Sequence, residues 1–68
     1  MSNEEYIKRI DFLNSIYMRF VDLAAKEKLL VQQTAGDEQA MHRQLYAGYA
    51  LRRDAAKVQL TNFMETNG

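Results

Sequence analysis

The amino-acid sequence predicts an all-α protein, a hairpin of two long antiparallel helices that dimerises into a four-helix bundle. Three observations predict this fold. Proline is absent, and before the terminal residue the only glycines are Gly36 and Gly48. Apolar residues recur at helical spacing in both halves of the chain. The stretch around Gly36 is the one break between the two helical runs.

The first helix is expected over about residues 3–33. Ser2 and Glu5 have the spacing of a capping box, in which the Ser2 hydroxyl accepts a hydrogen bond from the N–H of Glu5. Apolar residues on one side of this helix form a central seam: Tyr6, Ile10, Leu13, Tyr17, Phe20, Ala24 and Val31. Further apolar residues widen this seam on both sides, namely Phe12, Ile16, Leu23 and Leu30 on one side and Ile7 and Val21 on the other. The apolar arc is therefore wider than one partner helix covers.

A turn is expected over about residues 34–37, followed by a second helix over about 38–65. Gly36 suits the left-handed conformation that ends a helix. Asp37 can cap the next helix, although Thr34 is a competing cap. A connection this short makes the two helices antiparallel neighbours, so the chain is expected to be one domain over residues 1–68.

The second helix carries two apolar stripes when projected at 100° per residue. The first stripe contains Leu45, Tyr49, Ala56, Leu60 and Phe63, with Tyr46 and Met64 at its edge. The second stripe lies on roughly the opposite side and contains Ala40, Ala47, Leu51, Ala55 and Val58. One stripe can face the first helix of the same chain, and the other then faces solvent or another molecule. The sequence does not decide which stripe forms the dimer.

Size favours a homodimer. A chain of 68 residues buries only ~60% of its unfolded surface and usually needs a further source of stability. Cysteine is absent, and the single histidine, His42, does not build a zinc site alone. The residues expected in the core or dimer interface are Ile10, Leu13, Tyr17, Phe20, Leu45, Leu60 and Phe63.

No catalytic, cofactor-binding or metal-binding motif is predicted, so the chain is expected to be a protein-binding module and not an enzyme. Its partner-binding residues are predicted to be Tyr46, Tyr49, Arg52 and Arg53, because tyrosine and arginine often dominate binding energy and Gly48 opens the helix surface between the tyrosines. The alternative is that the tyrosines pack in the core and that Arg53 forms an intramolecular or dimer salt bridge. Glu27 interrupts the first seam and is expected to meet His42 or Arg43.

The balance of charge argues against a nucleic-acid or membrane partner. Nine basic residues match nine acidic ones, so the formal net charge is zero. The basic residues of the second helix are scattered around it: Arg43, Arg52, Arg53 and Lys57. The N-terminus is acidic, and no apolar run approaches the ~20 residues that span a bilayer. A soluble cytoplasmic protein is expected.

The layout resembles two kinds of small protein. The segment from Gly36 to Ala40 resembles the turn of the plasmid Rop-type RNA-binding bundle, which implies an RNA- or DNA-binding four-helix bundle. Size, absence of cysteine, two long helices and richness in aromatic residues resemble the small phage-encoded hairpin dimers that disable host regulators, including anti-quorum-sensing proteins. The second resemblance implies an inhibitor or modulator of a bacterial transcriptional regulator or other host protein. A structural subunit of a larger helical assembly is a further alternative.

Overall fold

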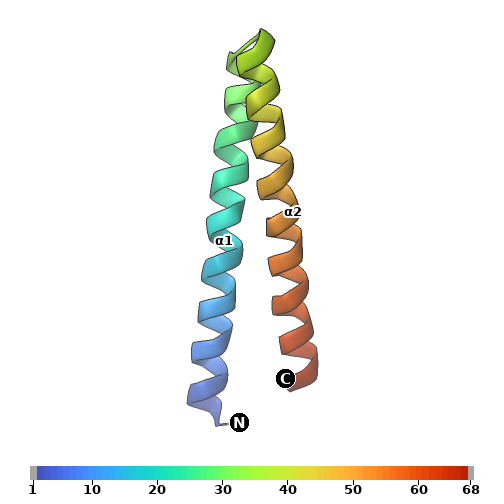
Figure 1. Ribbon diagram of the computed structural model, residues 1–68. Coiled ribbons are helices and arrows are strands. Elements are labelled where there is room, and N and C mark those ends of the chain that lie inside the picture. The colour runs from blue at the N-terminus through green and yellow to red at the C-terminus, as the bar shows by residue number, and fades with distance from the viewer. Residues whose placement is uncertain (1, 68) are drawn as a thin grey trace.

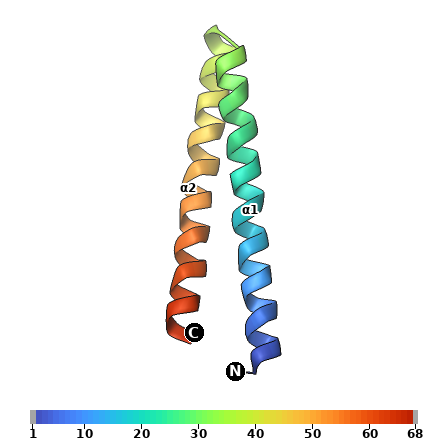
Figure 2. The ribbon, with the colours of Figure 1, turned by 180° about the vertical axis from the view of Figure 1, so that it is seen from behind.

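The computed structural model describes residues 2–67 and confirms the predicted hairpin. Helix α1 spans Asn3–Gln33 and helix α2 spans Gly36–Asn67. The two helices run antiparallel and side by side along their whole length (Figure 1), and the view from behind shows the same arrangement (Figure 2). Met1 and Gly68, which the predicted domain includes, lie outside the described residues. The dimer stays a prediction.

The ends of the helices follow from local hydrogen bonding. The Ser2 hydroxyl accepts a hydrogen bond from the N–H of Glu5 at 3.2 Å, as the capping box predicts. At the other end of α1, the Thr34 hydroxyl donates to the carbonyl oxygen of Leu30 at 2.7 Å. Gly36 has a φ of +63°, the left-handed conformation expected for it. Because α2 already begins at Gly36, Asp37 lies in the first turn, where its charge suits the positive end of the helix dipole.

On each helix, the residues that face the other helix recur at a regular spacing. We call these residues the seam. On α1 its half-buried or buried members are Tyr6, Ile10, Leu13, Tyr17, Phe20, Ala24, Glu27, Val31 and Thr34. On α2 they are Gln39, His42, Tyr46, Tyr49, Arg53, Ala56, Leu60 and Phe63. Successive members are alternately three and four residues apart, which is the heptad repeat of a coiled coil. The hairpin is therefore an antiparallel two-helix coiled coil.

Three contacts fix the register across the seam. The rings of Tyr6 and Phe63 stack with centroids 5.6 Å apart, His42 bonds to Glu27, and the Gln39 side chain donates to the Val31 carbonyl oxygen at 2.9 Å. The residue numbers of these pairs add to 69 or 70.

The same register continues along the rest of the seam. It sets Ala24 level with Tyr46, and Ala56 level with Leu13, so a small side chain meets a large one. Ala24 and Ala56 are the only buried residues within residues 2–67.

Leu45 does not occupy the seam position that the sequence projection gave it. Tyr46 lies in the seam instead, and Leu45 lies beside it with 39% of its surface exposed. A projection at 100° per residue drifts by ~20° per heptad against a 3.5-residue repeat. Over a helix as long as α2, this drift exchanges neighbouring positions at the edge of a stripe.

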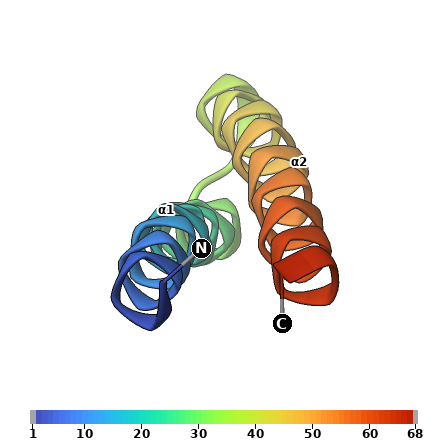
Figure 3. The same ribbon diagram turned by 90° about the horizontal axis from the view of Figure 1, so that it is seen from below.

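The hairpin is long and thin. Its extents are 52 × 15 × 11 Å, and its radius of gyration is 15.5 Å, whereas a compact chain of this length has a radius of about 11 Å. Seen from below, the two helices stand alone, with no further element over either side (Figure 3). Within residues 2–67, neither helix has an apolar stretch long enough to cross a membrane.

Candidate functional site

The four predicted partner-binding residues divide between two environments. Tyr46, Tyr49 and Arg53 lie half-buried in the seam, facing α1. Arg52 is exposed on the side of α2 next to the seam. The structure thus brings three of the four together between the helices and leaves Arg52 available to a partner. Partner binding by these residues stays a prediction.

Arg53 forms an ion pair on its own helix. Its Nε atom lies 3.1 Å from the Oδ1 atom of Asp54, and the Asp54 carboxylate is exposed. The hydrogen bond with Asp54 raises the pKa of Arg53 above its ordinary value, and Tyr46 adds a smaller effect in the same direction. The expected salt bridge of Arg53 is therefore intramolecular. It also neutralises the one acidic residue in the middle of α2.

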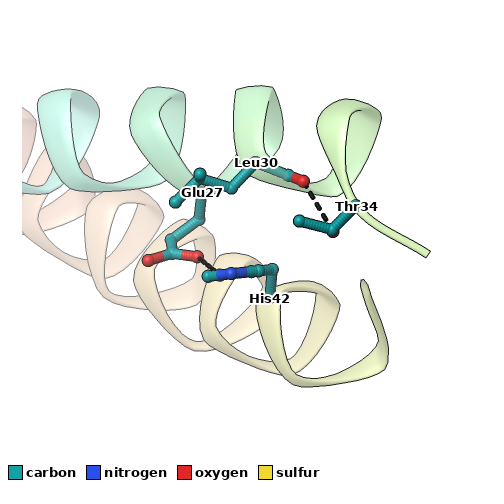
Figure 4. A network of polar contacts seen from close by, with 4 residues as sticks. All are labelled: Glu27, Leu30, Thr34 and His42. Atoms are coloured by element: carbon teal, nitrogen blue, oxygen red, sulfur yellow. Dashed lines mark hydrogen bonds and ion pairs between the residues drawn. The ribbon is translucent and has the colours of Figure 1, made fainter. Parts of the chain in front are cut away.

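Glu27 and His42 form a polar pair inside the seam near the turn. The Nδ1 atom of His42 lies 2.6 Å from the Oε2 atom of Glu27, and the two side chains are 12% and 15% exposed. Figure 4 shows the pair bridging the two helices, with the Thr34–Leu30 hydrogen bond one turn away. The prediction that Glu27 meets His42 or Arg43 is confirmed for His42. The Glu27–His42 pair links α1 to α2 near the turn.

The outer face of α2 is an uncovered apolar surface. All five residues of the second predicted stripe are exposed, namely Ala40, Ala47, Leu51, Ala55 and Val58. Leu51 is 72% exposed, the most of any large apolar side chain within residues 2–67. A Cβ atom added at Gly48 would meet nothing within 4 Å. We call Met41, Gly48, Leu51, Ala55 and Val58 the outer stripe. Its members are three, four or seven residues apart, which is the spacing that faces another helix.

A second apolar surface lies along one flank of the hairpin. We call Phe12, Ile16, Leu23, Leu30 and Leu45 the leucine flank. From the sequence, the four α1 residues are expected beside the seam and Leu45 in the core, with nothing that brings them together. The heptad repeat does, because Ile16, Leu23 and Leu30 each precede a seam residue by one position, as Leu45 does on α2. That repeat is the signal in the sequence that predicts this surface.

Nothing in the described part of the chain resembles an enclosed ligand site. One shallow hollow is lined by Asp54, Lys57, Val58, Thr61 and Asn62, and another by Glu5, Lys8, Arg9 and Phe12. Each is formed by a single helix, whereas small-molecule sites are concave clefts that enclose most of the ligand. Within residues 2–67, no three acidic or histidine side chains are grouped as metal ligands would be. The chemistry of the surface is that of helix packing.

The outer stripe and the leucine flank are thus two apolar surfaces of the hairpin that no other part of the described chain covers. Comparison of the chain with protein-family models, with curated proteins and with solved structures gives no match.

Proposed function

We propose that the chain is a non-enzymatic protein-binding module that works as a homodimer and offers the outer stripe of α2 to a helix of another protein. The observation that carries the proposal is the distribution of apolar side chains. Nine large apolar residues are exposed within residues 2–67, while only two alanines are buried. Contiguous apolar surface on a small protein marks an interaction site.

The shape of the outer stripe supports a helical partner. Gly48 and Ala55 lie in line with Leu51 and Val58, so small and large side chains alternate along the stripe. Small residues let another helix approach closely, and the larger ones supply apolar area to bury. The small phage inhibitors that the layout resembles bind bacterial regulators, so a transcriptional regulator is the first partner class to test.

Charge supports the proposal that the partner is acidic. Asp54 is paired with Arg53, whereas Arg43, Arg52 and Lys57 are exposed and have no ion pair within residues 2–67. The unpaired charges in the middle of α2 are therefore all positive. Arg52 lies at the edge of the outer stripe, whereas Arg43 and Lys57 lie on another side of α2. Complementary charge beside an apolar contact speeds association and selects the partner.

Capture of a partner by the immobilised chain, followed by titration of the purified partner, tests the proposal. We expect Leu51→Asp and Val58→Asp to weaken binding by about 10-fold or more, because each places a charge in the contact. Arg52→Ala is expected to weaken it as well. Leu29→Asp is the matched control, since Leu29 is a similarly exposed apolar residue on α1.

Circular dichroism of each variant checks that the helices remain. If Leu51→Asp and Val58→Asp both bind the partner as tightly as the unchanged chain, the outer stripe is not the binding surface. If Leu29→Asp weakens binding equally, the loss is not specific to α2, and the proposal also fails.

A further inference from the structure

We infer that a second copy of this chain packs against the leucine flank, and that the two hairpins lie antiparallel, the turn of each beside the open end of the other. The inference rests on the proposed homodimer. It adds which face the two copies share and in which direction they run. The outer stripe of α2 then stays free for a different partner.

The leucine flank is continuous across both helices. In an antiparallel pair, residues at equivalent heptad positions of the two helices lie on the same side of the seam. Leu23 and Leu45 share one heptad position, and the register sets them level with each other on this side. Ile16 and Leu30 extend the surface by two turns in each direction. Ile16, Leu23 and Leu30 are half-buried by α2 alone, so a second hairpin completes their burial.

The opposite flank is a poorer surface for a second copy. Residues that follow a seam residue by one position lie there, and they include Asn14, Lys28, Arg43 and Lys57, all of them exposed. The apolar residues of this flank are Val21 and Ala50, which are half-buried in the middle of the flank, Met18, and Ile7 and Met64 at the open end. Two copies joined by this flank would bring like charges together, which costs free energy. The leucine flank carries cations as well, because Arg52 shares the heptad position of Leu45, and Arg19 and Lys26 also precede seam residues of α1. Its advantage is the larger apolar area of Ile16, Leu23, Leu30 and Leu45.

Charged residues at the two ends of the leucine flank determine whether the two hairpins of the dimer run parallel or antiparallel. Glu38 lies at the turn end and Arg9 near the open end, and each is at the same heptad position as the leucines. Neither forms an ion pair within residues 2–67. In an antiparallel dimer, Glu38 lies beside the partner's Arg9, and the same pair forms again at the other end. A parallel dimer instead sets Glu38 beside Glu38 and Arg9 beside Arg9, which is repulsive at both ends.

The exposed area matches what a dimer needs. The accessible surface of the hairpin is 5208 Å², whereas a compact monomer of its mass, 7.9 kDa, exposes about 4,400 Å². The excess is thus about 800 Å², which is about the area that each partner buries in a stable protein interface. One further copy on one flank covers this excess.

Sedimentation equilibrium of substituted chains tests whether the leucine flank is the dimer interface. Phe12 and Leu45 are exposed in the single hairpin, so Phe12→Lys and Leu45→Lys leave its seam intact. We expect each to raise the dimer dissociation constant about 10-fold or more, because a lysine then lies in the apolar contact. Ile7→Lys, on the opposite flank, and Leu29→Lys are matched controls with similar exposure, and both are expected to remain dimeric.

The outcomes separate this inference from the proposed function. A folded monomer of the unchanged chain at micromolar concentration would overturn both the inference and the homodimer. A dimer that survives Phe12→Lys and Leu45→Lys but is lost in Ile7→Lys would overturn the inference alone. Circular dichroism distinguishes loss of the dimer from loss of the helices.

Cysteine cross-linking tests the direction, because the chain contains no cysteine. Arg9→Cys and Glu38→Cys are prepared separately, mixed and treated with a short bifunctional thiol cross-linker. The cross-linker is needed because Arg9 and the partner's Glu38 lie on diagonal helices of the dimer, farther apart than the ~7 Å between Cα atoms that a direct disulfide allows. We expect the product that joins the two variants. Cross-linking of each variant to itself, with no mixed product, would show a parallel dimer and overturn the antiparallel arrangement.

Discussion

Glu27 and His42 occupy seam positions at which a two-helix coiled coil ordinarily places apolar side chains. Each satisfies the other at 2.6 Å, and both are largely removed from solvent. A half-buried polar pair contributes little to stability when it is complete, and removal of one member leaves the other unsatisfied. The pair therefore fixes which residues meet across the hairpin more than it adds to its free energy of unfolding.

We therefore expect that the effects of substituting Glu27 and His42 on the free energy of unfolding do not add. Glu27→Ala should lower the free energy of unfolding by about 1–3 kcal/mol, since it leaves His42 without a partner in the seam. The double variant Glu27→Leu with His42→Leu should be as stable as the unchanged chain or more stable, because both positions then pack as apolar residues. Urea denaturation followed by circular dichroism measures both.

Glu4→Ala is the control for this prediction, because the Glu4–Lys8 pair is exposed to solvent. We expect it to change the unfolding free energy by less than about 0.5 kcal/mol. A double leucine variant that is less stable than Glu27→Ala would show that the polar pair itself stabilises the fold.

At the scale of the helices, Gly36 and Gly48 have different structural roles. Gly36 has a positive φ and begins α2, so the chain reverses there without strain. Gly48 lies inside α2 with ordinary helical geometry, and a methyl group at this position would meet nothing within 4 Å. Gly36 is required by the backbone, whereas within the single hairpin Gly48 lowers the helix propensity of α2.

The glycines therefore predict opposite effects of the same substitution. Gly36→Ala should destabilise the hairpin by about 1–2 kcal/mol, the cost of a left-handed conformation for a residue with a side chain. Gly48→Ala should stabilise α2 by up to about 1 kcal/mol. Thermal unfolding at equal protein concentration measures both changes. Destabilisation by Gly48→Ala would show that a second copy packs on the outer stripe, and it would contradict a dimer that shares only the leucine flank.

The whole molecule is a charge-balanced rod with apolar surfaces on more than one side. Its nine basic residues equal its acidic residues in number, and those on the middle of α2 are distributed around the helix. A nucleic-acid partner would require a basic face that follows the phosphate backbone. The structure offers long apolar stripes instead, which suit the packing of helices.

This distribution predicts weak binding to RNA. We expect no submicromolar affinity for RNA hairpins in fluorescence anisotropy, and little change in binding between about 50 and 200 mM salt, where a protein with many phosphate contacts loses 10³-fold or more. Tight binding that salt removes, and that Arg52→Ala or Lys57→Ala also removes, would favour the Rop-like alternative over protein binding.

The sequence by itself determined the two helices and the turn. Long runs free of proline, a serine cap and a left-handed glycine are local features, so their effect is visible without any partner helix. It also predicted that Glu27 meets His42 or Arg43, because a short turn fixes which residues of two antiparallel helices are level. It further predicted that one of the two stripes of α2 is uncovered, since one helix of the same chain covers only one side of α2, but the structure decided that this is the second stripe.

Only the tertiary structure decided which residues form the seam and which flank it. The seam follows the 3.5-residue repeat of two helices wound around each other, and this repeat differs from that of a single straight helix. For that reason Tyr46 and Arg53 lie between the helices, while Leu45 lies outside and joins Leu23 on one flank. A surface built from two helices depends on their register and direction, and neither helix contains that information alone.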